Sequence, residues 1–147
     1  MATTILLRLA ALTGEGRYRE AAERALGTVT PYLARYPTGF AQWLVAASLA
    51  ASDIVEVAIV GDPAEPETRE LLAPVWATWR PQQVLALASP DRVGAGAPTS
   101  EVPLLRDRVA IDGRPTAYVC RNFVCNLPVT DAAALEEQLR SDPARDR

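Results

Sequence analysis

The chain of 147 residues has a hydrophobic fraction of 49%, a charged fraction of 22% and a formal net charge of −3. These values are typical of one globular domain and argue against a disordered or fibrous chain. The slight negative charge also argues against the phosphate neutralisation that dominates nucleic-acid binding, so no nucleic-acid partner is expected.

Two residue types are missing from the sequence. It contains no His and, because all 15 basic residues are Arg, no Lys. This excludes lysine Schiff bases, the phosphate-loop lysine, His-assisted Ser or Cys nucleophiles and every zinc site that uses His. Any catalysis would have to use carboxylates, Tyr, Cys or Arg. We therefore expect no self-sufficient catalytic site, no metal site and no cofactor in this chain.

The first third of the sequence is predicted to be helical. Apolar side chains recur at helical spacing over residues 4–13, and two glycines follow where that helix should stop. A second, amphipathic helix is predicted over residues 18–35, with a dent or a restart at Pro31. A third helix, over residues 40–52, has almost no polar face, so it requires cover on nearly all sides.

From residue 54 onward the pattern changes to that of an α/β unit. Two short apolar runs, 55–60 and 83–88, flank a predicted helix over residues 65–79 that Pro74 must kink or split. Strand, helix and strand in this order predict a right-handed crossover between two parallel strands.

The remaining residues are predicted to form a loop, a strand and a helix. Residues 89–103 are rich in Gly, Pro, Ala and Ser, which predicts a loop, and the glycines of 94–96 indicate flexibility only. A third strand is predicted over residues 115–121. A last helix, capped by Thr130 or Asp131, runs to Arg140.

These elements predict an α+β or α/β fold in two parts, a helical segment over 1–53 and a small α/β subdomain over 54–141, followed by a frayed tail over 142–147. The sheet is expected to have three strands, mostly parallel, with flanking helices. Because parallel sheets are normally covered on both faces, the first three helices are expected to cover one face, and the apolarity of the third helix calls for more protein still.

The chain is expected to be cytoplasmic. Residues 1–4 lead into an apolar helix without the basic segment and small-residue cleavage site of a signal peptide. The longest apolar stretch, 40–51, is shorter than the roughly 20 residues that cross a bilayer, so no membrane partner is expected. In a reducing compartment the two cysteines are expected to be free thiols.

Cys120 and Cys125 are the candidates for thiol chemistry. Four residues separate them, which is not the two-residue spacing of a thioredoxin-type pair. A straight strand would place their Cα atoms about 16 Å apart, whereas a disulfide tolerates less than about 7 Å. A bridge would require residues 121–124 to turn back sharply. Free structural thiols are therefore expected, and a redox role or a metal role stays open as an alternative.

Three other residues are candidates for binding a small ligand. Asp62 follows the first predicted strand, at the end where open α/β sheets place ligands, and could hold a ribose hydroxyl or a cation. The glycine-rich fingerprint of nucleotide sites is missing, so Asp62 is expected instead to cap the next helix. Arg121 and Asn122 could bind an anion beside the thiol, although the expected role of this pair is a solvated strand end.

Two further patterns have structural interpretations. The three tryptophans, Trp43, Trp76 and Trp79, lie in the predicted helices and are expected in a core or an interface rather than in a sugar-binding platform. The segment from Gly16 to Ala21 is similar to the turn of a tetratricopeptide repeat. No matching motif follows one period of about 34 residues later, so a solenoid is not expected.

Three segments of the chain resemble one known family. They are Leu6–Gly14, Glu56–Asp62 and, most specifically, Ala117–Cys125 followed by Pro128 and Val129. On these residues the chain resembles the C-terminal end of the YyaL-like, spermatogenesis-associated family of thioredoxin-domain proteins. The resemblance covers nearly all of this chain but only a small part of a typical family member.

The resemblance implies a fold and a set of partners. Full-length members are understood to begin with a thioredoxin-like domain and to continue into a six-hairpin α/α toroid similar to that of glycosidases and N-acylglucosamine epimerases. Residues 4–52 would then be the closing helices of the toroid, and residues 54–140 an α/β appendage. The remainder of the toroid and the thioredoxin-like domain would be the partners of this chain, with self-association as the alternative.

The function expected from the sequence is that of a non-catalytic scaffold or docking segment of a larger, carbohydrate-enzyme-like protein. One alternative is a thiol-dependent redox element built on Cys120 and Cys125. Another is small-ligand binding at the strand ends near Asp62 and Ser89.

Overall fold

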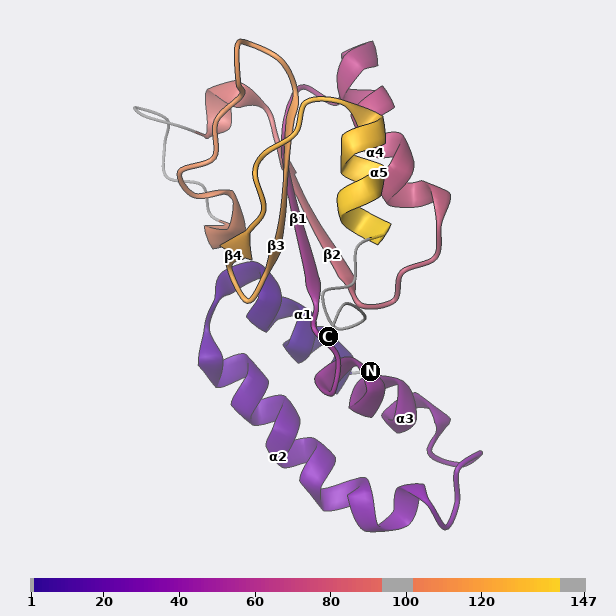
Figure 1. The fold of residues 1–147 in the computed structure, drawn as a ribbon. Coiled ribbons are helices and arrows are strands. Elements are labelled where there is room, and N and C mark those ends of the chain that lie inside the picture. The colour runs from indigo at the N-terminus through magenta and orange to yellow at the C-terminus, as the bar shows by residue number, and fades with distance from the viewer. Residues whose placement is uncertain (1, 94–101, 141–147) are drawn as a thin grey trace.

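The computed structural model describes residues 2–93 and 102–140, which form five α-helices and a four-stranded sheet (Figure 1). The helices are α1 (Ala2–Thr13), α2 (Gly16–Leu33), α3 (Ala41–Ala50), α4 (Pro66–Ala77) and α5 (Ala132–Arg140). The strands are β1 (Val55–Val60), β2 (Gln83–Ala88), β3 (Thr116–Arg121) and β4 (Val124–Cys125), and two short 3-10 helices are η1 (Pro90–Arg92) and η2 (Pro103–Leu105). The predicted frayed tail 142–147 and the glycines of 94–96 lie outside the described residues.

The sheet is mixed, with the strand order β2-β1-β3-β4. β1 and β2 are parallel and joined through α4, as predicted, whereas β3 is antiparallel to β1 and β4 is antiparallel to β3. The α+β class is confirmed, but the expectation of three mostly parallel strands is wrong. Its physical reason is the connection after β2. Ala88 at the end of β2 and Thr116 at the start of β3 both pair with Val60, so the chain re-enters the sheet at the end where it left it.

Both faces of the sheet are covered by apolar side chains. On one face, residues of β1 and β3 pack with α4 and α5, which contribute Leu71, Val75, Leu135 and Leu139 to this apolar core. On the other face, the alternate residues of the same strands pack with Leu7 of α1 and with Leu104 and Leu105 of η2. The expectation that the first three helices cover one face is confirmed for α1 only, because α2 and α3 pack on α1 and on each other. The face that α1 and η2 cover is also the face that carries the candidate site.

The helices α2 and α3 lie beyond α1, away from the sheet (Figure 1). They pack on α1 and on each other. α2 runs through Pro31 without a break and ends at Leu33, and Gly14 forms the turn between α1 and α2 with a φ of 70°. A left-handed φ of this kind suits glycine, because a side chain there would be strained.

Two aspartates in turns have different roles. Asp131 caps α5, since its Oδ1 accepts a hydrogen bond of 2.8 Å from the Ala134 N–H, and this prediction is confirmed. Asp62 accepts a similar bond of 2.8 Å from the Ala64 N–H, but α4 begins only at Pro66. The expectation that Asp62 caps this helix is therefore wrong: it stabilises the turn that precedes it.

Candidate functional site

The two cysteines face each other across a tight hairpin. β3 and β4 are joined by Asn122 and Phe123, with φ values of 49° and 62°. Positive φ at both central residues is the signature of a type I′ turn, which directly reverses the chain. Cys120 and Cys125 are register partners. The next pair away from the turn, Val119 and Asn126, is hydrogen-bonded, with the Asn126 N–H donating to the Val119 carbonyl. The cysteines therefore occupy a non-hydrogen-bonded position, where opposing Cα atoms are closest.

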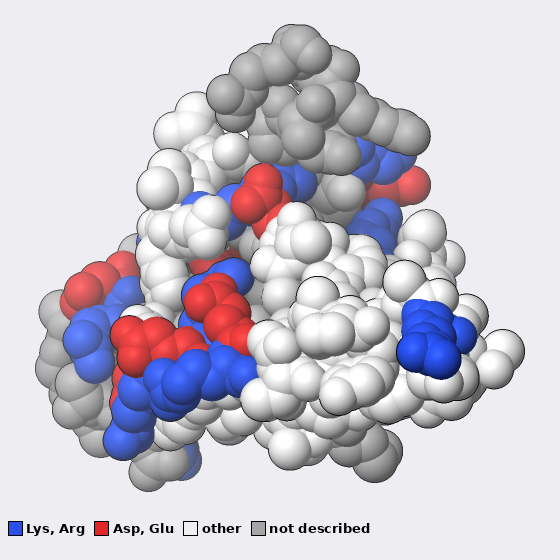
Figure 2. All heavy atoms as spheres, turned by 90° about the horizontal axis from the view of Figure 1, so that it is seen from below, with Lys and Arg blue, Asp and Glu red and all other residues white. Residues whose placement is uncertain are grey.

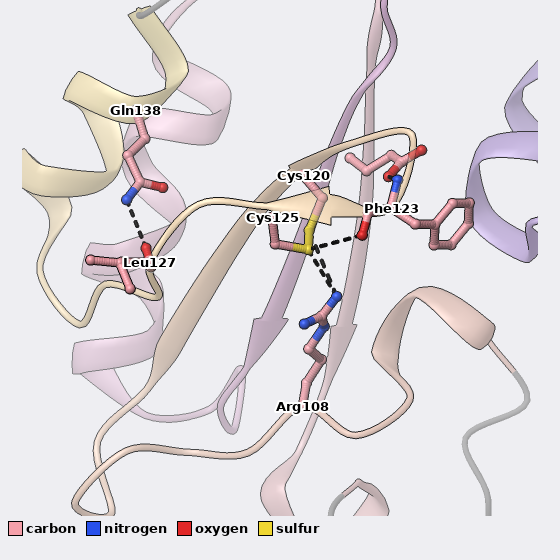
Figure 3. Close-up of a disulfide and its surroundings, with 7 residues drawn as sticks. Arg108, Cys120, Phe123, Cys125, Leu127 and Gln138 are labelled. Carbon is pink, nitrogen blue, oxygen red and sulfur yellow. Dashed lines mark hydrogen bonds between the residues drawn. A yellow bond between two sulfur atoms is a disulfide. The ribbon is translucent and has the colours of Figure 1, made fainter.

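Cys120 and Cys125 form a disulfide, with their Cα atoms 3.9 Å apart (Figure 3). The expectation of free thiols is wrong, because residues 121–124 make the sharp reversal that a bridge requires. The segment after β4 is fixed to α5, since the Gln138 side chain donates a hydrogen bond of 2.8 Å to the Leu127 carbonyl. The chain that leaves the disulfide hairpin is thus held against α5.

A guanidinium lies against the disulfide. Arg108 Nη2 is 2.9 Å from Cys125 Sγ and 3.7 Å from Cys120 Sγ (Figure 3). The same guanidinium lies 4.9 Å from the ring centroid of Tyr118, within cation–π range. The Tyr118 hydroxyl donates a bond of 2.8 Å to the Val109 carbonyl, which fixes the segment that carries Arg108. A positive charge held at this distance stabilises a thiolate relative to a thiol.

A carboxyl group is buried on the same face of the sheet. Glu56 of β1 is 3% exposed and is the register partner of Cys120 on β3. Its Oε2 accepts a hydrogen bond of 2.9 Å from the Phe123 N–H. Burial raises the pKa of Glu56, and the bond from Phe123 and the charge of Arg108 oppose this rise without cancelling it. Opposing residues in such a pair are about 5 Å apart at Cβ, so Glu56 and Cys120 lie side by side on this face of the sheet.

Phe123 joins the hairpin to the helical segment. Its ring lies against Gly14, where an added Cβ would be 3.2 Å from the Phe123 Cζ atom. Beside this contact is a shallow hollow of about 180 Å³, lined in part by Glu15, Arg19 and Asn122. The site is therefore built by residues from β1, the β3–β4 hairpin, the segment after η2 and the α1–α2 turn.

The three residues predicted to bind a ligand do not come together. Arg121 pairs with Val55 at one end of β1, whereas Asp62 follows Val60 at the other end. Asn122 lines the hollow beside Phe123, and Arg121 lines a separate open groove of about 500 Å³. Among the described residues no group of three or more Cys, Asp or Glu side chains could hold a metal ion.

Arg108 and Glu56 are the residues that sequence reasoning missed. Glu56 could have been found, because it is the single acidic residue inside the apolar run of β1 and a charge there must be buried. Nothing in the sequence links Arg108 to the cysteines, because their contact depends on the path of the chain between η2 and β3.

A second feature is an uncharged surface on the helical segment. Residues 25–52 contain one charged residue, Arg35. Large apolar or aromatic side chains are nonetheless exposed there: Tyr32, Tyr36, Leu44 and Val45. Figure 2 shows the molecule from this end, with most charged side chains gathered toward one side and a broad uncharged area beside them. We call these four residues the α2–α3 surface.

Of the two expected positions for the tryptophans, a core or an interface, the core is wrong for two of them. Trp76 and Trp79 are 70% and 84% exposed, so neither is a core residue, while Trp43 is half-buried. The reason is that Leu71 and Val75 already fill the buried face of α4 and that Trp79 lies beyond its end.

Within the described residues, no helix combines the length and apolarity that crossing a membrane requires.

Comparison with known proteins identifies relatives of this chain. It is 28% identical over 134 residues to spermatogenesis-associated protein 20 of Rattus norvegicus and of Homo sapiens, and 27% identical to that of Mus musculus. The match covers 91% of this chain but spans only 17% of the length of each relative. No family model matches the chain, and no solved structure matches it significantly. The chain is thus similar to a part of spermatogenesis-associated protein 20, which confirms the resemblance predicted from the sequence.

Proposed function

We propose that this chain is a non-catalytic docking segment whose α2–α3 surface packs against helices of a longer protein. The observation that carries the proposal is the single charge among residues 25–52, together with the exposed side chains of the α2–α3 surface. Covering a surface of this kind removes apolar area from water and requires the desolvation of few charges. Interface cores have the same composition, poor in charge and rich in aromatic side chains.

The proposed occupant is the helical remainder of a longer polypeptide. In the relatives, the matched region is a small part of the protein, so most of their chain lies outside it. By the family resemblance, that remainder would comprise a thioredoxin-like domain and the earlier hairpins of a six-hairpin, carbohydrate-enzyme-like toroid, with this chain at the C-terminal end. A location in the cytoplasm is part of the same proposal.

Site-specific cross-linking tests this proposal. A photo-reactive residue placed at Val45, and in a control at Glu23 on the charged half of α2, is activated in the host cell, and the cross-linked peptide is sequenced. The proposal predicts one predominant product at position 45, with an amphipathic helix that lies outside residues 1–147, and little product at position 23. Products at position 45 that come only from a second copy of this chain, or no product there, would overturn it.

A matched pair of variants separates docking from folding. Val45→Glu introduces a charge at an exposed position, so the free energy of unfolding of the isolated chain should change by less than about 0.5 kcal/mol. Affinity for the cross-linked partner should fall at least tenfold. Leu49→Ala removes a buried side chain of the same helix and should cost about 2–5 kcal/mol of stability instead. Equal affinity of Val45→Glu and the unsubstituted chain would contradict the proposal.

A second candidate function is that of a thiol-dependent redox element, which the contact between Arg108 and the disulfide favours. A purely structural disulfide resists reduction in the folded state, whereas a redox element exchanges without unfolding. The test is reduction of the native chain by dithiothreitol, followed by thiol counting and near-ultraviolet circular dichroism. Two thiols in a chain that keeps its native signal support the function, and reduction only on unfolding excludes it.

A further inference from the structure

The two sulfur atoms of the disulfide have unequal surroundings. Cys120 is 1% exposed and lies over the sheet, whereas Cys125 is partly exposed at the rim of the hairpin. We propose that Cys125 is the sulfur attacked by an external protein dithiol, that Cys120 is the leaving sulfur, and that Arg108 and Glu56 assist the exchange. This inference rests on the redox element named as the second candidate function.

The partner class follows from the exposed residues close to Cys125 in the chain. Val124 precedes Cys125 and is 77% exposed, and Leu127 follows it and is 85% exposed. Exposed apolar side chains on this hairpin and on the segment after it favour a protein dithiol with an apolar surface around it over a small charged thiol such as glutathione. Dithiothreitol serves as the uncharged small-molecule probe of the same chemistry.

The first step forms a mixed disulfide. A thiolate of the dithiol attacks Cys125 Sγ, a new sulfur–sulfur bond forms, and the bond to Cys120 breaks with its electron pair left on Cys120 Sγ. The Glu56 carboxyl then gives its proton to the Cys120 thiolate and becomes a carboxylate. In the second step the other thiol of the dithiol loses its proton to water and attacks the first sulfur, which releases Cys125 as a thiolate. The dithiol is oxidised by two electrons, and the disulfide is reduced by two.

Arg108 acts on both sulfur atoms. Its guanidinium lies near both, closer to Cys125, so it stabilises the negative charge that forms first on Cys120 and finally on Cys125. The stacking on Tyr118 holds the charge in place throughout.

Glu56 supplies the proton that the buried leaving group requires. Cys120 is shielded from water, and Glu56 is its direct neighbour across the β1–β3 pair. The charged groups that face this carboxyl are Arg108 on the sheet side and, across the hollow, Arg19 and Glu15 of the helical segment. The buried carboxyl keeps its proton to a higher pH than an exposed one does, because burial raises its pKa.

The role of Arg108 is tested in the Cys120→Ser variant, which leaves Cys125 as a single thiol. Its thiolate is followed by ultraviolet absorbance against pH and by the rate of alkylation with iodoacetamide. Adding Arg108→Gln should lower the thiolate fraction at neutral pH about tenfold. Arg106→Gln removes the same charge from an exposed neighbouring position and should have no such effect. Equal thiolate fractions in the Arg108→Gln and Arg106→Gln backgrounds would overturn the assignment.

The roles of the two sulfurs and of Glu56 are tested by the reduction kinetics of the full chain. In a brief reaction with dithiothreitol quenched in acid, the mixed disulfide should be found on Cys125 by mass spectrometry. Glu56→Gln keeps an acceptor for the Phe123 N–H but has no proton to give, so reduction should slow about tenfold. Its rate should then follow only the thiolate fraction of dithiothreitol, without the pH dependence that Glu56 adds, and Glu56→Asp should restore part of both. A mixed disulfide on Cys120, or an unchanged rate and pH profile in Glu56→Gln, would overturn the proposal.

The two levels of the proposal fail differently. If the disulfide of the folded chain resists dithiothreitol altogether, the redox function itself is excluded. If it is reduced readily but at a rate indifferent to Arg108 and Glu56, only the assignment of these residues is excluded.

Discussion

At the scale of single residues, Gly14 and Phe123 meet at the joint between the hairpin and the helical segment. Gly14→Ala places a Cβ at a left-handed φ of 70° and 3.2 Å from the Phe123 ring, so both the backbone and the contact are strained. Gly113→Ala has a similar φ of 72° but open space around it. Each substitution should cost about 1 kcal/mol for its backbone, and Gly14→Ala should cost more because of the ring.

Urea unfolding of both variants, alone and combined with Phe123→Ala, measures the difference. The extra cost of Gly14→Ala should disappear when the ring is removed. Equal costs of the two glycine substitutions in the unaltered background would show that the ring does not bear on Gly14.

Glu56 predicts a specific dependence of stability on pH. Its pKa in the folded chain lies above its ordinary value of about 4.5, so folding favours the protonated carboxyl. The stability linked to this proton is fully present below the ordinary pKa and is lost as the pH rises through the folded value. The free energy of unfolding of Glu56→Gln, taken relative to that of the unsubstituted chain, should therefore increase as the pH rises from acidic to neutral.

The measurement is the free energy of unfolding of both proteins across that pH range, with Glu70→Gln, an exposed carboxyl of α4, as the control. The control should show no comparable pH-dependent gain. A difference between Glu56→Gln and the unsubstituted chain that stays constant with pH, or shrinks as the pH rises, would be the opposite of what the buried carboxyl predicts.

The sequence identified the cysteines of the candidate site but not their bond. A type I′ turn is usually recognised in a sequence by the pair Asn-Gly. Here Phe123 occupies the second position, which favours glycine. The tertiary contact with Gly14 and the hydrogen bond to Glu56 hold Phe123 there. Both partners are far away in the chain, so local pattern reasoning could not have found the turn.

At the scale of elements, the two aspartates offer a direct comparison. Asp131→Ala removes the cap of α5 and should cost about 1 kcal/mol, which thermal unfolding of the purified variant measures. Asp62→Ala breaks a turn bond outside any helix and should cost less. Equal or inverted costs would mean that Asp62 supports α4 despite its distance from the first turn.

Elements with strong local signals were predictable, and elements defined by pairing were not. β1 and β2 have the predicted bounds because apolar runs of this length are closed by Gly61 and Ser89. β4 has two residues and no periodicity of its own, so only its pairing with β3 defines it. The direction of β3 could not be predicted either, because it depends on where the connection from β2 re-enters the sheet.

At the scale of the whole molecule, the sheet and the helical segment differ in how completely their apolar side chains are buried. The sheet is covered on both faces, whereas α2 and α3 rest on α1 and on each other and expose the α2–α3 surface (Figure 1). The sequence indicated this imbalance through the nearly all-apolar third helix, although it could not show which side chains stay exposed. This form is typical of a docking segment: the sheet is buried on both faces within the chain, whereas the helical part exposes apolar side chains that a partner would bury.

Hydrogen–deuterium exchange of the isolated chain tests this central claim most directly. Local opening is easiest where few side chains are buried, so the amides of α3 and of the second half of α2 should exchange much faster than those of β1 and α1. On binding of the cross-linked partner, the gain in protection should be confined to α2 and α3. If α2 and α3 were as well protected as β1 in the isolated chain, the helical segment would be complete by itself and the account would be contradicted.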